Sequence, residues 1–212
     1  MRIDFISDLT CPWCAIGLRT LEQAIVRVAA SVPVTLHLQP FELNPGLPTE
    51  GEAIAAYAAR KYDGVSAAEL AERQTLIRRR ARALGMEFKL RTHVYNTFDA
   101  HRLLHWAGLQ GRQLELKHAL LRAYHEHGRN PAAPEVLLDA AVEAGLDRWA
   151  AGDVLGRGTY ADEVRIAVRC WQRLGIDGVP ATVIDGTQLI SGAQPVEVYE
   201  QTLRRICARS TA

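Results

Sequence analysis

The sequence predicts an α/β fold in which strands lie near both ends of the chain and helices fill the middle. Strand, helix and strand patterns come first, within about forty residues. From about residue 50 to residue 171 the patterns are helical, separated by Gly, Pro and Asn, with no convincing strand. Two short strands about a glycine-containing turn then precede a final helix, which indicates an antiparallel hairpin.

The first predicted element is a strand over residues 2–7, an apolar run that stops at the polar turn Ser7-Asp8. A helix is predicted over about residues 14–30, because apolar residues recur there near the helical period. Ser31-Val32-Pro33 breaks this helix, and residues 34–41 then alternate between apolar and polar, as in a second strand. A right-handed crossover would make the two strands parallel.

The turn-forming segment Asn44-Pro45-Gly46-Leu47-Pro48 marks a change in the character of the chain. Helices are predicted beyond it over about residues 51–62, 66–85, 97–109, 111–127, 134–145, 147–155 and 160–174. Gly145 is expected at the C′ position of one of them, and Asp147 is expected to cap the next. Three tryptophans are expected in the core: Trp106, Trp149 and Trp171.

The end of the chain predicts a hairpin and a helix. Gly178-Val179-Pro180 precedes two short strands, Thr182-Val183-Ile184 and Gln188-Leu189-Ile190, which flank the turn Asp185-Gly186. Residues 196–208 form the closing amphipathic helix.

Size, charge and cysteine content narrow the class of protein. The chain has 212 residues, of which 48% are hydrophobic, so it can bury a sizeable core. Its formal net charge of +1 indicates no nucleic-acid or anionic-membrane partner. No apolar run approaches the roughly 20 residues of a membrane-spanning helix, and no secretory leader precedes the first strand, so we expect a cytoplasmic protein. Four cysteines are too few for a disulfide scaffold at this length.

The most informative stretch is Cys11-Pro12-Trp13-Cys14, which follows the first strand. Residues three positions apart share one face of a helix, so the two thiols are expected to lie together. Thr10 is expected to cap this helix, and Pro12 suits its first turn. Cys11 would then lie at the positive end of the helix dipole, which favours the nucleophilic thiolate. Cys14 would serve as the thiol that resolves the mixed disulfide. Trp13 is expected to be exposed, as an apolar edge for a partner.

Half of a zinc site is the main alternative for these two thiols. A tetrahedral zinc needs about four ligands, usually from a second closely spaced pair. The other candidate ligands are two single cysteines and two histidine pairs: Cys170, Cys207, His101 with His105, and His125 with His127. Because the two single cysteines are far apart in sequence, we predict no metal site and favour dithiol–disulfide exchange.

Several further segments match one known family. They are Phe41-Glu42-Leu43-Asn44-Pro45, the run NTFDAHRL at residues 96–103, Gly178-Val179-Pro180 and the run ISGAQP at residues 190–195. Together with the Cys-Pro-Trp-Cys motif they resemble the DsbA family of the thioredoxin superfamily. They are most similar to its FrnE-type branch of cytoplasmic thiol-disulfide oxidoreductases. The resemblance covers nearly the whole chain, from about residue 3 to residue 205.

This resemblance implies a thioredoxin fold, a central mixed β-sheet flanked by helices, with a large inserted all-helical domain. The thioredoxin-like domain would comprise residues 1–48 and 172–212, and the helical domain residues 49–171. The family's proline loop implies a cis bond between Val179 and Pro180, with the backbone of Val179 turned toward the thiols to pair with a substrate strand.

Two residues of the helical region, Asn96 and His101, are implied by the same resemblance to line the groove over the thiols. The alternative is that Asn96 caps a helix and that His101 is a hydrogen-bonded interior side chain.

The predicted function is a protein thiol-disulfide oxidoreductase or isomerase that forms a mixed disulfide at Cys11 and needs no bound cofactor. Its partners would be protein or low-molecular-weight thiols and disulfides. Glutathione stays open as a redox partner, and a homodimer as an assembly. One alternative is a glutathione-dependent enzyme of the kappa-class transferase or hydroxychromene-carboxylate isomerase type, which has Ser at the position of Cys11. Another is a non-enzymatic binder or chaperone.

Overall fold

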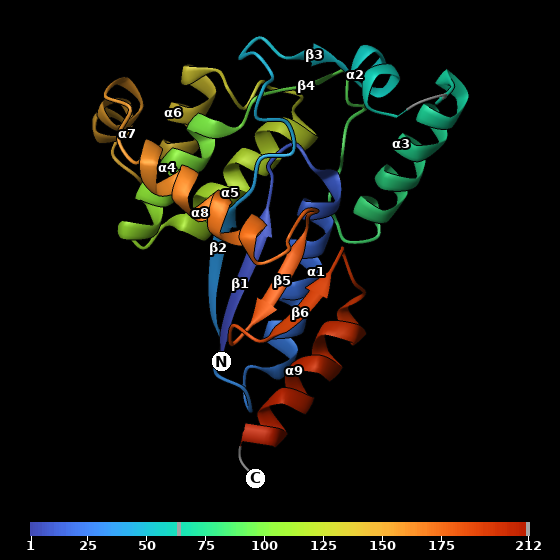
Figure 1. The fold of residues 1–212 in the computed structure, drawn as a ribbon, viewed down its shortest axis with the longest axis vertical. Coiled ribbons are helices and arrows are strands. Elements are labelled where there is room, and N and C mark those ends of the chain that lie inside the picture. The colour runs from blue at the N-terminus through green and yellow to red at the C-terminus, as the bar shows by residue number, and fades with distance from the viewer. Residues whose placement is uncertain (63–64, 211–212) are drawn as a thin grey trace.

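A four-stranded mixed sheet forms the centre of the computed structural model, which describes residues 1–62 and 65–210 (Figure 1). The strand order is β2-β1-β5-β6. Strand β1 (Arg2–Ser7) runs parallel to β2 (Thr35–Pro40) and antiparallel to β5 (Ala181–Ile184). Strand β6 (Gln188–Ser191) runs antiparallel to β5. Strands from the two ends of the chain thus meet in one sheet, and the predicted thioredoxin-like fold is confirmed.

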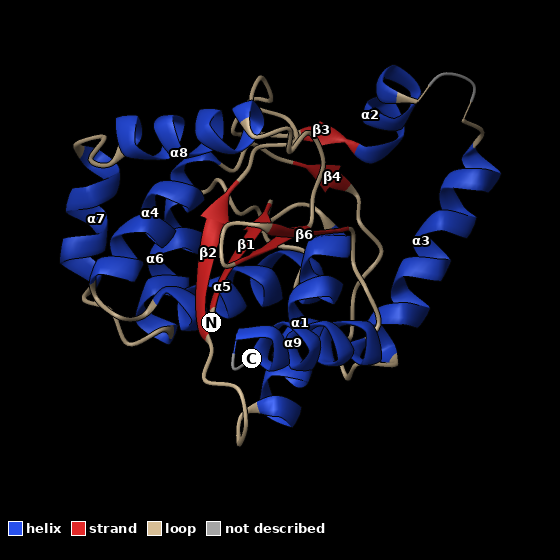
Figure 2. Ribbon diagram, turned by 60° about the horizontal axis from the view of Figure 1, so that its bottom comes forward, coloured by secondary structure: helices blue, strands red, loops and turns tan. Residues whose placement is uncertain are grey.

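The sheet positions the first helix because β1 lies between two other strands and is buried along its length. Its residues from Ile3 to Ser7 are all buried, as expected for a central strand. Helix α1 (Pro12–Val28) follows after only four residues and packs against α9 (Val196–Ser210) on one face of the sheet (Figure 2). Full burial of an apolar side chain such as Phe5 contributes about 1.5–3 kcal/mol, so this packing fixes where α1 begins.

Between β2 and β5 the chain is mostly helical, as the sequence predicts. The helices are α2 (Ile54–Lys61), α3 (Ala67–Arg82), α4 (Phe98–Leu109), α5 (Gln113–Leu121), η1 (Arg122–Glu126), α6 (Pro134–Glu143), α7 (Arg148–Gly156) and α8 (Ala161–Arg173). The residues predicted to end one helix and to cap the next are found in these positions. Gly145 follows the last helical turn of α6 with a φ of +78°, and the Asp147 side chain accepts a hydrogen bond from the Ala150 N–H.

Three details of this helical region differ from the sequence prediction. Two-residue strands β3 (Glu52–Ala53) and β4 (His93–Val94) form an antiparallel pair, which is too short to leave a periodic pattern. The helix predicted over residues 111–127 changes to π-helical geometry in η1, its last turn. The Trp149 side chain lies on the first turn of α7 and is 87% exposed, so its predicted core position was wrong.

The helical region flanks the sheet on two sides. Helices α4 to α8 gather beside β2, whereas α2 and α3 lie across from them, near the beginning of α1 (Figure 2). One apolar core includes residues of the sheet, α1 and α4 to α7, so these helices share their packing with the sheet. The boundaries predicted at residues 48 and 171 stay predictions. In the part of the chain that the structure describes, no helix is long and apolar enough to cross a membrane.

Candidate active site

Helix α1 begins one residue later than the capping pattern suggests. Cys11, with φ −82° and ψ 112°, is the N-cap residue, and its side chain makes no capping hydrogen bond. The predicted cap, Thr10, was wrong because its side chain is used elsewhere. Its N–H and hydroxyl lie 3.0 and 3.3 Å from Asp8 Oδ1. This turn places Cys11 at the positive end of α1, where the backbone N–H groups of Trp13 and Cys14 favour its thiolate.

Both thiols of the motif are free and nearly buried. The exposed fraction is 6% for Cys11 and 1% for Cys14. The Cys11 thiol donates to the carbonyl oxygen of Val179 at 3.7 Å, which brings the loop before β5 against the start of α1. The peptide bond between Val179 and Pro180 is cis. Cys11 is therefore the reachable sulfur, and Cys14 lies one turn further into the core.

Burial and hydrogen bonding separate the pKa values of the two thiols. The pKa of Cys11 is lowered chiefly by a hydrogen bond from the Cys14 thiol, with help from the backbone N–H groups of Cys14 and Trp13. Burial and the Cys11 thiolate raise the pKa of Cys14 well above the usual value. The first thiol is thus the easier of the two to ionise, which is the division of roles that disulfide exchange requires.

Two buried charged residues, Asp8 and Lys117, lie at the carboxyl end of β1, next to the thiols. Asp8 is 1% exposed and its carboxylate accepts hydrogen bonds from the N–H groups of Leu43, at 2.7 Å, and Thr10. Lys117, also 1% exposed, donates to Ser7 Oγ at 3.0 Å. Burial raises the pKa of Asp8 and lowers that of Lys117. The Lys117 ammonium also favours the thiolate form of Cys14.

The predicted groove residues Asn96 and His101 hold the segment after β2. His101 is buried and its Nε2 lies 3.0 Å from the carbonyl oxygen of Phe41, while burial lowers its pKa to about 3. The Asn96 amide donates to the carbonyl oxygens of Pro45, at 3.2 Å, and Leu47, at 3.1 Å. Neither side chain lines the pocket beside Cys11, so contact of these two residues with substrate stays a prediction.

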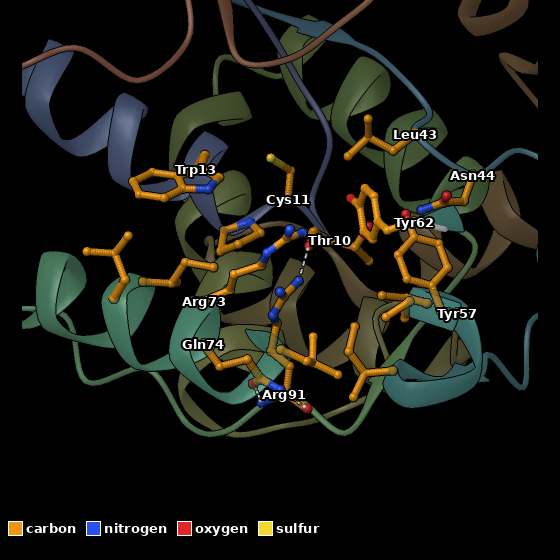
Figure 3. A pocket seen from close by; sticks show the side chains of 17 residues that line it. Thr10, Cys11, Trp13, Leu43, Asn44, Tyr57, Tyr62, Arg73, Gln74 and Arg91 are labelled. Atoms are coloured by element: carbon orange, nitrogen blue, oxygen red, sulfur yellow. Dashed lines mark hydrogen bonds between the residues drawn. The ribbon is translucent and has the colours of Figure 1, made fainter. Parts of the chain in front are cut away.

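A cavity of about 230 Å³ opens beside Cys11, between the start of α1 and helices α2 and α3 (Figure 3). Its walls are mostly apolar or aromatic, and Trp13, 36% exposed, forms one edge. Arg73 and Arg91 reach into it, as Figure 3 shows. The side-chain amide of Gln74 clamps the backbone of Arg91, accepting from its N–H at 2.9 Å and donating to its carbonyl at 3.3 Å. Cys11 thus lies between this cavity and Val179.

Comparison with known proteins agrees with this geometry. The family model of the DSBA-like thioredoxin domain matches residues 2–204. The chain belongs to this family. A probable DsbA oxidoreductase from Streptomyces coelicolor is 35% identical, with a TM-score of 0.87 over 97% of this chain and 89% of that chain. An uncharacterised Bacillus subtilis protein, YwbO, is 26% identical over 96% of both chains. A putative protein disulfide isomerase from Nitrosomonas europaea, 18% identical, has a TM-score of 0.75 over 100% of this chain and 98% of its own.

Sequence reasoning missed several residues of this DSBA-like site. Asp8 reads only as part of a turn, and its burial depends on the segment after β2. Lys117 leaves a weak signal, because it is a charged residue among leucines at helical spacing in α5. Arg73 and Arg91 leave none, since two ordinary surface-like arginines come together only through the path of α3 and the segment after it. Among the described residues, no group of three or more His, Cys, Asp or Glu side chains is placed to hold a metal ion.

Proposed function

We propose that this protein is a thiol-disulfide oxidoreductase in which Cys11 exchanges disulfides with the substrate and Cys14 resolves the mixed disulfide. The observation that carries the proposal is the placement of two free thiols, with Cys11 at the N-cap of α1, 3.7 Å from the Val179 carbonyl oxygen, and Cys14 one turn further in. Membership of the DSBA-like family and the fold it shares with disulfide-exchanging proteins support this function.

In the reducing direction, the Cys11 thiolate attacks one sulfur of a substrate disulfide. The other substrate sulfur leaves as a thiolate, and a Cys11–substrate disulfide forms. Cys14 then loses its proton, attacks Cys11 Sγ and releases the second substrate thiol. Two electrons pass from the protein dithiol to the substrate, and Cys11–Cys14 is left as a disulfide. The oxidising direction is the reverse of these steps.

The carbonyl of Val179 supports a role in holding a protein substrate. In the free enzyme this carbonyl accepts a hydrogen bond from the Cys11 thiol. A mixed disulfide has no S–H group, so its formation frees the Val179 carbonyl to accept an N–H of a substrate strand. The exposed Trp13 ring offers an apolar contact on the other side of the sulfur.

Within the family we propose the FrnE-type branch, on the strength of the Cys-Pro-Trp-Cys motif and the segments at residues 41–45, 96–103 and 190–195. The presence of Cys14 supports dithiol exchange over the glutathione-dependent alternative, because a dithiol closes its own disulfide. Cytoplasmic location and homodimer formation stay predictions.

Trapping the intermediate tests this proposal. In the Cys14→Ser variant the mixed disulfide cannot be resolved, so we expect a covalent adduct when Cys11 attacks an intact disulfide of insulin or of a disulfide-bearing peptide. The adduct should map to Cys11 by mass spectrometry and disappear with dithiothreitol. A Cys170→Ser background removes an exposed thiol that could react nonspecifically. Adducts that map only to other cysteines, or no adduct, would contradict the proposed role of Cys11.

A further inference from the structure

We propose that the cavity beside Cys11 binds a small thiol or disulfide that carries carboxylate groups, with Arg73 and Arg91 as the carboxylate-binding residues. This inference rests on the proposed function, because it takes Cys11 as the reacting thiol. It adds a charge preference among low-molecular-weight thiols and disulfides, and it names the two residues that would recognise the charge.

The shape of the cavity favours a small molecule. Its volume of about 230 Å³ is below the roughly 300–1,000 Å³ of pockets for drug-sized ligands. Apolar and aromatic side chains of α2 and α3, such as Tyr57 and Ile77, form the wall that faces Cys11. The Val179 carbonyl, where we place a protein strand, is not part of this wall. A ligand in the cavity would therefore approach the sulfur from the other side.

The charge of the cavity wall favours an anion. Arg73 and Arg91 both line it, and no lining residue in the described part of the chain is acidic. The ion pairs between described residues include neither arginine, whereas Arg60 on the neighbouring α2 pairs with Glu52 at 2.7 Å. Two guanidinium groups with no carboxylate partner leave an unbalanced positive charge beside a nucleophilic sulfur. A guanidinium binds a carboxylate through two parallel hydrogen bonds, which makes this group the complementary ligand.

Both arginines are held in orientations that keep them at the cavity. The Arg91 backbone is clamped by Gln74, and its guanidinium donates to the carbonyl oxygen of Thr10 at 3.4 Å. The Arg73 guanidinium lies over the Tyr62 ring, 5.5 Å from its centroid. In Figure 3 both guanidinium groups lie below Cys11, next to Thr10, and the Cys11 sulfur points away from them. Arg91 would therefore lose little side-chain freedom on binding, whereas the exposed Arg73 side chain is held by the ring contact.

The reaction with a small disulfide uses the same two exchange steps as the reaction with a protein substrate. The Cys11 thiolate attacks a small disulfide R–S–S–R, forms Cys11–S–S–R and releases one RS⁻, which takes up a proton from water. Cys14 loses its proton to water, attacks Cys11 Sγ and releases the second RS⁻, which is protonated in turn. The protein dithiol gives up two electrons, and one small disulfide becomes two thiols.

The test compares three small disulfides of different charge: 3,3′-dithiodipropionate (anionic), bis(2-hydroxyethyl) disulfide (neutral) and cystamine (cationic). Rate constants for oxidation of the reduced full-length protein are measured by acid quenching and mass analysis. The wild type should react fastest with the anionic disulfide, after each rate is divided by that of the same disulfide with dithiothreitol. We expect Arg73→Gln and Arg91→Gln each to lower the anionic rate about tenfold, because one charge-assisted hydrogen-bonded contact is lost.

Two controls make the outcome decisive. The matched variant Arg80→Gln removes an arginine of the same helix α3 that does not line the cavity, and it should leave all three rates within about twofold. The neutral disulfide separates ligand binding from thiolate activation. If the arginine variants slow all three disulfides equally, or leave the anionic rate unchanged, the inference is wrong, although Cys11 still reacts. If the wild type reacts with none of them, the proposed function itself fails.

Discussion

Replacement of Cys11 by serine is expected to lower the rate of insulin disulfide reduction by at least about 10³-fold, the scale on which loss of a catalytic nucleophile acts. A serine hydroxyl cannot form a disulfide, and the other thiol of the motif cannot substitute for it. Cys14 is 1% exposed and burial holds its pKa high, so it is both unreachable and protonated at neutral pH. Precipitation of the insulin B chain in the presence of dithiothreitol measures this rate.

The matched control is Cys170→Ser, which removes the exposed thiol near the end of α8 and should keep full activity. The pH dependence provides a second readout. Because the pKa of Cys11 is lowered, the wild-type rate with a small disulfide should reach its plateau at a lower pH than that of an ordinary cysteine. Insulin reduction that survives in Cys11→Ser would contradict the role of Cys11 as the reacting thiol.

Replacement of Asp8 by alanine is expected to destabilise the protein by roughly 3–4 kcal/mol, the largest effect on folding that we predict at the site. The carboxylate accepts hydrogen bonds from the N–H groups of Leu43 and Thr10, and its removal leaves the partly buried Leu43 N–H and the buried Thr10 N–H without this partner, at about 1–3 kcal/mol each. The change also loosens the turn that places Cys11. Urea unfolding at pH 7 measures the loss, with Asp162→Ala as the exposed control, since the Asp162 side chain is 88% exposed.

The more conservative Asp8→Asn change should lower the free energy of unfolding by an amount that depends on pH. Burial raises the pKa of Asp8 in the folded protein above its unfolded value, so folding takes up a proton between these two pKa values. The wild type therefore gains stability from this group at low pH and loses that gain as the pH rises through the folded pKa. Asparagine has no such gain, so the cost of Asp8→Asn should be largest near pH 4 and smaller at pH 7. A cost that grows with pH would contradict a raised pKa.

Much of the fold is predictable because local signals and the tertiary structure agree. The predicted helix over residues 66–85 is observed as Ala67–Arg82, with a capping box between Ser66 and Glu69. The Cys11-Cys14 pair is predictable for the same reason, because spacing, proline and helix start all act within one turn. Thr10 shows the limit of this reasoning. Its hydroxyl donates to the nearby carboxylate of Asp8 instead of capping the helix, and Cys11 takes the N-cap position.

The rest of the site depends on contacts between distant segments, which no local pattern records. Lys117 and Ser7 are 110 positions apart, and Arg91 and Thr10 are 81 apart. His101 illustrates the difference: its segment is singled out by resemblance, but its partner, the Phe41 carbonyl, lies 60 positions away in the segment after β2. The charge of the cavity likewise arises only when α3 and the following segment fold over α1.

A redox titration of the full-length protein tests the central claim most directly. The protein is equilibrated in buffers of graded thiol-to-disulfide ratio, alkylated, digested and analysed by mass spectrometry. The account predicts one two-electron transition in which the Cys11 and Cys14 peptides become linked to each other, while Cys170 stays alkylated throughout. A transition that links either thiol to a different cysteine, or the absence of any Cys11–Cys14 disulfide across the whole range, would contradict it.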